Sequence, residues 1–225
     1  FDEIPPRNLT SWTTLITGYA QHGLGDNALK CLLCMQEEGL SPNEVTFTCI
    51  LKACGNLRVV QKGEEIYAEL QKQRLLERNN MLGNALVDMY ARCVALGKAH
   101  KALNEFSVRD VASWTVLIAG YVEEGSNHKA LNCFERIQTE GICPNVITYG
   151  FALKACSNIG VLDDKGKQIH DDVVNNRLCV IKKDVVLGTA LLGMYAKCGM
   201  LAKPQEVHNG ILCRDVVSWS TLISV

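Results

Sequence analysis

Ser11-Trp12-Thr13-Thr14-Leu15-Ile16-Thr17-Gly18-Tyr19 recurs further along the chain as Ser113-Trp114-Thr115-Val116-Leu117-Ile118-Ala119-Gly120-Tyr121, and its opening occurs a third time at residues 218–223. A second segment, residues 83–93, recurs in the same order at residues 188–198. Since two separate segments return at nearly the same spacing, the chain contains an internal repeat. Such repetition is typical of arrays of stacked structural units.

Each unit of the repeat has the pattern of two short helices. In the first unit Leu15, Ile16 and Tyr19 share one face of a first helix, helix A, and Gly23 and Gly25 interrupt it. Apolar residues then follow at helical spacing in a second helix, helix B. A lone helix pair buries too little surface to be stable, so neighbouring pairs must stack. The period therefore predicts an all-α fold, a right-handed superhelical α-solenoid of helix-turn-helix repeats.

Glycine-rich and Pro-Asn breaks divide the chain into consecutive units. We expect two rounds of three units, preceded by the tail of an earlier unit and followed by a truncated one. The ranges are 1–8 for the tail, 9–43, 44–79 and 80–110 for the first round, 111–145, 146–184 and 185–215 for the second, and 216–225 for the truncated unit. We expect a piece of a longer array, whose open ends expose apolar helix faces.

The composition argues against several classes of protein. With 48% hydrophobic residues the chain can form a core, but no apolar run approaches the roughly 20 residues needed to span a membrane, so we expect no membrane partner. Cys54 recurs as Cys156, and we interpret the eleven cysteines as reduced framework residues. Cys31 and Cys34 have a zinc-like spacing without a second pair, so we expect neither metal nor cofactor.

Catalysis is not indicated either. The five histidines fall in separate units without a shared motif or a carboxylate pattern beside them, and no other set of acid, base and nucleophile stands out. Trp12, Trp114 and Trp219 recur beside the start of helix A, which favours packing between units over an exposed stacking role. We therefore expect a binding protein and not an enzyme.

The repeats resemble one known family. Residues 89–93, 140–145 and 216–223 resemble the helix A openings and unit ends of pentatricopeptide repeats. The cycle of unit lengths resembles the plant PLS-type subclass, with standard units at 9–43 and 111–145, long units at 44–79 and 146–184, and short units at 80–110 and 185–215. The resemblance extends over essentially the whole chain.

The resemblance implies sequence-specific binding of single-stranded RNA, about one base per repeat. The chain would be the target-recognition part of an organellar RNA editing or processing factor, acting on a transcript in a mitochondrion or chloroplast. A deaminase or an editing accessory protein would then act with it through regions outside this chain, since no deaminase zinc signature occurs here. The alternative is a protein-binding solenoid that takes a peptide in its concave groove, and the net charge of −1 keeps this alternative open.

In this family the fifth and last residues of a unit flank the same base, and we call them the reading pair. An ionised Asp can only accept a hydrogen bond, as from the ring N–H of uracil or guanine, whereas Asn can donate to the ring nitrogen of adenine or cytosine. By the family's code the chain would prefer 5′-A-N-U-A-N-G-3′, with Thr48 and Gly150 of the long units reading poorly. The reading pairs are Thr13 with Asn43, Asn84 with Asp110, Thr115 with Asn145, and Thr189 with Asp215.

Two further sets of residues follow from the resemblance. The second residue of each unit would sandwich bases, and a basic residue late in helix A would contact phosphate. Because Thr, Asn and Asp are also favoured at helix starts, the reading residues have capping as an alternative role. The candidates are Val45, Met81, Ile147, Val186 and Val217 for the sandwich, and Arg92 and Lys197 for phosphate.

Overall fold

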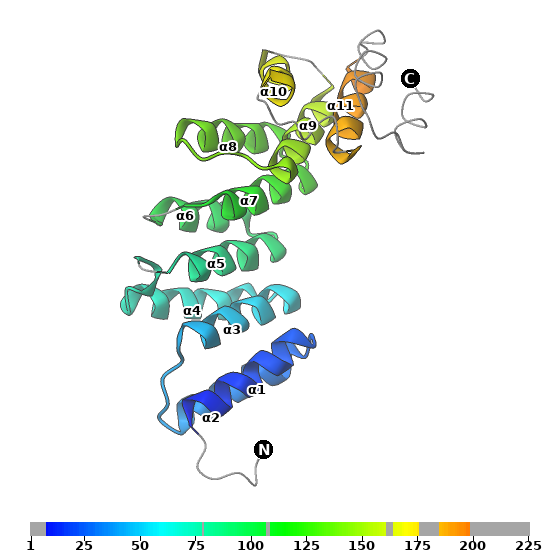
Figure 1. Ribbon diagram of the computed structural model, residues 1–225. Helices are drawn as coiled ribbons and strands as arrows, with labels where there is room; N and C mark the ends of the chain where they lie inside the picture. The colour runs from blue at the N-terminus through cyan, green and yellow to red at the C-terminus, as the bar shows by residue number, and fades with distance from the viewer. Residues whose placement is uncertain (1–7, 78, 107–108, 161–163, 176–184, 199–225) are drawn as a thin grey trace. The chain divides into compact units, whose positions relative to one another are not determined.

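The computed structural model describes residues 8–77, 79–106, 109–160, 164–175 and 185–198 (Figure 1). Within these ranges the chain forms α-helices and one short 3₁₀ helix, η1 (Leu75–Glu77), and no strand. The all-α prediction is confirmed.

The helices alternate between helix A and helix B of successive units. The A helices begin at the residues that open the units in the sequence-based division, while the assignment of standard, long and short types remains a prediction. The A helices are α1 (Leu9–Gln21), α3 (Glu44–Leu57), α5 (Asn80–Arg92), α7 (Val111–Glu123), α9 (Val146–Ile159) and α11 (Val185–Lys197). The B helices are α2 (Gly25–Glu37), α4 (Val60–Lys72), α6 (Leu96–Glu105), α8 (Asn127–Thr139) and α10 (Asp164–Asn175).

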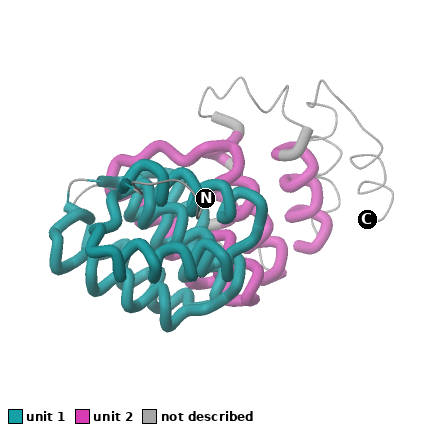
Figure 2. The backbone as a smooth tube through the Cα atoms, turned by 90° about the horizontal axis from the view of Figure 1, so that it is seen from below, with its two compact units in different colours: residues 1–117 teal, residues 118–225 magenta. Residues whose placement is uncertain are grey.

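The chain divides into two compact units, residues 1–117 and residues 118–225 (Figure 2). In the first compact unit α1 packs against α2 and α3, and α3 packs against α4 and α5. In the second, α9 packs against α8, α10 and α11. An A helix thus contacts its own B helix and the next A helix, which is the stacking expected of a solenoid.

Buried apolar side chains fill the space between these helices. Ile16 of α1 and Ile50 of α3 have no exposed surface, and in the second compact unit the rings of Phe134 and Tyr149 meet edge to face with centroids 5.4 Å apart. Trp12 and Trp114 are also buried, which supports the packing role expected for them. Trp219 lies outside the described residues.

A left-handed residue ends helix α1, where the sequence predicts a glycine break. Gly23 has φ +74°, a conformation that side chains with a Cβ rarely adopt. Its N–H donates to the Ala20 carbonyl at 3.3 Å, and the next N–H, of Leu24, donates to the Tyr19 carbonyl at 2.9 Å. This glycine therefore turns the chain from α1 into α2 and satisfies carbonyl groups at the end of α1.

We predict opposite effects of alanine at two glycines of this first unit. Gly23→Ala should lower the free energy of unfolding by about 1 kcal/mol, because a Cβ is strained at positive φ. Gly18→Ala, inside α1 with open space around its Cβ position, should raise it by up to about 1 kcal/mol through helix propensity. Urea denaturation of both variants measures the difference. Equal effects would contradict the role assigned to Gly23.

Candidate functional site

The second residue of an A helix is exposed wherever the structure describes its side chain. These residues are Thr10, Val45, Met81, Ala112 and Ile147. Three of them are large and apolar, with 54% of Val45, 68% of Met81 and 61% of Ile147 exposed. In five A helices the third residue is buried, and these residues are Thr46, Leu82, Ser113, Thr148 and Leu187. The sandwich candidates therefore lie on the surface and not in the core, while the side chain of Val186 and all of Val217 lie outside the described structure.

The last residue of a unit caps the following helix A. Asn43 Oδ1 accepts a hydrogen bond from the N–H of Thr46 at 2.9 Å, and Asn145 Oδ1 accepts one from Thr148 at the same distance. Asp110 Oδ1 likewise accepts from the N–H of Ser113 at 3.0 Å. The capping role considered in the sequence is thus present in the structure. It uses one of the two terminal atoms of each side chain.

The first reading pair is joined through a third residue. Thr13 of α1 and Asn43 make no direct hydrogen bond, but the buried Thr46 connects them. Its Oγ1 lies 3.0 Å from Thr13 Oγ1 and donates to Asn43 Oδ1 at 2.9 Å. Sequence reasoning did not find Thr46, because its contact with Thr13 joins residues on different helices. Thr13 and Asn43 are themselves half-buried, so part of each side chain reaches the surface.

The reading pair of the third unit is in direct contact. Asn84 Nδ2 donates to Asp110 Oδ2 at 2.7 Å. Burial alone would raise the pKa of Asp110, but hydrogen bonds from Asn84 and Ser113 outweigh it and hold the pKa below its ordinary value. Asp110 is therefore ionised at neutral pH and presents only hydrogen-bond acceptors.

The described residues of the other two reading pairs have separate surroundings. Thr115 is buried, and its Oγ1 donates to the Val111 carbonyl at 2.6 Å. It belongs to the first compact unit and Asn145 belongs to the second. Thr189 is half-buried in α11, and Asp215 lies outside the described residues.

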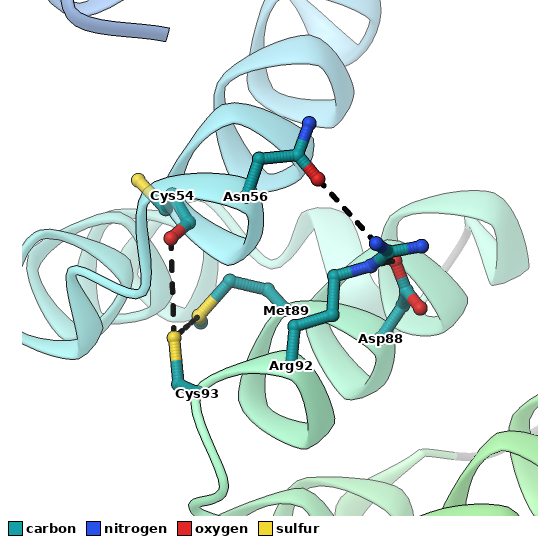
Figure 3. Close-up of polar contacts among 6 residues, drawn as sticks. All are labelled: Cys54, Asn56, Asp88, Met89, Arg92 and Cys93. Carbon is teal, nitrogen blue, oxygen red and sulfur yellow. Dashed lines mark hydrogen bonds and ion pairs between the residues drawn. The ribbon is translucent and has the colours of Figure 1, made fainter. Parts of the chain in front are cut away.

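The two phosphate candidates have different surroundings. Arg92 Nε lies 2.8 Å from Asp88 Oδ2, and its Nη1 donates to Asn56 Oδ1 at 3.4 Å (Figure 3). Lys197 is exposed at the end of α11, and Gly193 stands four residues before it where Asp88 precedes Arg92. The charge of Arg92 is therefore partly neutralised by a carboxylate four residues earlier, and the corresponding position before Lys197 is a glycine.

An apolar groove of about 560 Å³ lies between α9 and α11. Its lining includes Ile147 and Gly150, the second and fifth residues of the long unit, together with Phe151. Lys154 and Lys197 also line it. The structure thus brings the sandwich candidate of one unit and the phosphate candidate of the next to a single surface. Sequence reasoning missed Phe151, although the small fifth residue Gly150 was a signal of open space.

Two buried cysteines have environments that make them poor nucleophiles. Burial raises the pKa of Cys54 to about 12 and the pKa of Cys133 to about 12, so these thiols remain protonated. Cys93 lies beside Met89 and the Cys54 carbonyl, with its Sγ 3.9 Å from each partner atom (Figure 3). Over the described residues, no three His, Cys, Asp or Glu side chains gather as metal ligands would. No described helix has the length and apolar character to cross a bilayer.

Stacked helix pairs with the same surface positions in unit after unit define a tandem-repeat α-solenoid protein. The model of the PPR repeat family matches residues 7–56 and 109–158. With this repeat in two copies and relatives along the entire chain, the protein belongs to the pentatricopeptide repeat family.

The relatives are longer than this chain. Pentatricopeptide repeat-containing protein At2g33680 of Arabidopsis thaliana is 38% identical over 224 residues, which is 100% of this chain and 30% of that protein. The Arabidopsis protein At4g18520, chloroplastic, is 34% identical over 99% of this chain and 35% of its own length. The chain thus spans only part of each.

Solved structures share the fold. The crystal structure of the pentatricopeptide repeat protein PPR10 from maize aligns with a TM-score of 0.71 and 20% identity, over 97% of this chain and 32% of PPR10. PPR10 in complex with an 18-nt psaJ RNA element aligns with a TM-score of 0.76 and 19% identity, over 96% of this chain and 32% of PPR10.

Proposed function

We propose that this chain binds single-stranded RNA in a sequence-specific manner, with about one base per repeat. The observation that carries the proposal is the exposed second residue of A helices α1, α3, α5, α7 and α9, which is large and apolar in Val45, Met81 and Ile147 and lies about one turn from the fifth residue and the cap. Apolar contact with a base face is tolerant of sequence, whereas a fixed hydrogen-bonding group beside it can select the base edge. The complex of PPR10 with RNA supports the proposal.

The reading pairs would select the bases. Asn43 and Asn145 each use Oδ1 for capping, which leaves the amide Nδ2–H₂ as a donor for adenine. The ionised Asp110 beside Asn84 would accept from the N–H of uracil. With Thr189 and Asp215 for guanine, the preferred sequence is 5′-A-N-U-A-N-G-3′, and the protein runs N to C along the RNA from 5′ to 3′.

We further propose that the parent protein acts in an organelle, in RNA editing or processing, and that the units are of the PLS type. The names of some relatives include "chloroplastic" or "mitochondrial", which supports an organellar site of action. A deaminase or an editing accessory protein would act with the parent through regions outside this chain.

A peptide-binding solenoid is the second candidate function. The apolar groove between α9 and α11 favours it, since an apolar peptide side chain could enter a space of this size. Selectivity for nucleotide sequence separates the two functions, because a peptide groove has no reason to distinguish bases.

We predict that the chain binds 5′-A-N-U-A-N-G-3′ more tightly than a permuted RNA of the same composition. Filter binding at two salt concentrations measures both affinities. The affinities should fall with salt for both RNAs, because phosphate contacts are electrostatic, while the ratio between the RNAs should persist. Equal affinity for matched and permuted RNA would refute the proposed function.

We predict that Asp110→Asn changes the preferred third base from uracil to cytosine. The amide replaces an obligate acceptor with a donor, which matches the ring nitrogen of cytosine, and Asn84 keeps the pyrimidine preference. The ratio of the two affinities should change by roughly threefold to tenfold in favour of cytosine. Asp26→Asn removes the same charge from the exposed first turn of α2 and should leave the ratio unchanged. A uracil preference that survives in Asp110→Asn would contradict this reading.

We predict that two substitutions, one beside each phosphate candidate, change RNA binding in opposite directions. Asp88→Ala frees Arg92 from its ion pair and should strengthen RNA binding, with the salt slope steeper by up to roughly 0.7. Gly193→Asp places a carboxylate four residues before Lys197 and should weaken binding and flatten the slope. Affinity measured over a range of salt concentrations gives both slopes. If neither slope changes, Arg92 and Lys197 do not contact phosphate.

A further inference from the structure

Thr46 lies between two reading residues without being one of them. It occupies the first turn of α3 with no exposed surface. Its Oγ1 is 3.0 Å from Thr13 Oγ1 on α1 and 2.9 Å from Asn43 Oδ1, which also accepts from the backbone N–H of Thr46. The three side chains form one continuous hydrogen-bonded chain that joins two A helices.

The number of protons that each group can donate determines the direction of the hydrogen bonds among these three side chains. The backbone N–H of Thr46 requires an acceptor, so the oxygen of the Asn43 amide must face it and Nδ2 must face away. An amide oxygen has no proton, so Thr46 donates its single hydroxyl proton to Asn43. Thr46 Oγ1 can then only accept from Thr13, and the Thr13 proton is directed inward.

The reading pair therefore presents a donor beside an acceptor. Asn43 offers the protons of Nδ2, and Thr13 offers only the lone pairs of Oγ1. Adenine and cytosine carry a ring nitrogen acceptor next to an exocyclic amino donor, and they complement this pattern. Guanine and uracil carry a ring N–H next to a carbonyl oxygen, and they oppose it at both atoms.

We propose that Thr46 is a positioning residue that makes the Thr13–Asn43 pair selective for amino-bearing bases over keto-bearing ones. The proposal rests on the proposed function, because it assumes that this pair meets a base. Through its buried hydroxyl, Thr46 directs the Thr13 proton inward, although it does not touch the RNA itself.

The contact between a buried threonine and an asparagine cap recurs in the second compact unit. Thr148 has no exposed surface, and its Oγ1 and backbone N–H both donate to Asn145 Oδ1 at 2.9 Å. The third unit differs, since Ser113 donates to the carboxylate of Asp110, and Asn84 contacts that carboxylate directly. A buried threonine thus accompanies an asparagine cap in two units, and the carboxylate cap has a different partner.

Thr46→Val tests the proposal, because valine keeps the shape and the backbone N–H cap but removes the hydroxyl. Thr13 can then rotate its proton outward and donate to the carbonyl of guanine. We expect the ratio of affinities for adenine over guanine at the first base to fall by roughly threefold to tenfold. Thr46→Ser retains a hydroxyl, so this variant should keep the wild-type ratio. Binding of otherwise identical RNAs with A or G at the first base gives the ratio.

The third base provides the internal control. Selection of uracil over cytosine by Asn84 and Asp110 should be unchanged in Thr46→Val, since that pair does not depend on Thr46. If the valine variant keeps the wild-type ratio at the first base while the wild type selects bases at both positions, the role of Thr46 is refuted and the proposed function stands. Loss of selection at both positions would show a general packing role and also refute it. A wild-type protein without selection at either base would overturn the proposed function itself.

Discussion

The hydrogen bond between the last side chain of one unit and the first turn of the next A helix is the constraint on which the rest of this surface depends. Asn8, Asn43, Asn79, Asp110 and Asn145 each accept from a backbone N–H of the helix that follows. The cap determines where the helix begins, and the start determines its phase. The second residue then projects to the surface and the third into the core.

This phase explains how one unit can serve both stability and binding. Thr46, Ser113 and Thr148 are buried at the third position, while Val45 and Ile147 are exposed one residue earlier. Asn43 and Asn145 use Oδ1 to cap the helix, so capping and the proposed base reading by Nδ2 would not compete for the same atom. The cap also prevents the amide from flipping, and a flipped amide would present an acceptor in place of a donor. A side chain held in one orientation by the fold loses little further freedom on binding.

Much of the architecture was predictable because it depends on local patterns. The recurrence of the segment that contains Trp12 and Trp114 predicts the alternation of helices, and the glycine break at Gly23 predicts the turn. The residue types of the reading pairs suit capping as well as base reading, so the sequence could not separate the two roles. The structure shows which terminal atom of Asn43, Asp110 and Asn145 caps a helix, and base reading stays a prediction.

The parts that could not be predicted depend on contacts between helices. Thr46 looks like an ordinary helix-start residue in the sequence, and its bond to Thr13 exists only because α3 packs against α1. The duplication also suggested that Arg92 and Lys197 would be equivalent, yet Asp88 pairs with the first and Gly193 precedes the second. The difference between Asp88 in the first round of repeats and Gly193 in the second therefore changes the local charge beside the basic residue.

The local charges also bear on how a chain with net charge −1 could bind a polyanion. A protein's overall charge determines long-range attraction, but contact energy depends on the charges within roughly one Debye length, about 8 Å at physiological salt. Lys154 and Lys197 flank an apolar groove, and neither forms an ion pair with another described residue. A strand bound at this groove would meet Lys154 and Lys197. The neutral total therefore argues against strong electrostatic steering from a distance, but it does not argue against RNA contact at this surface.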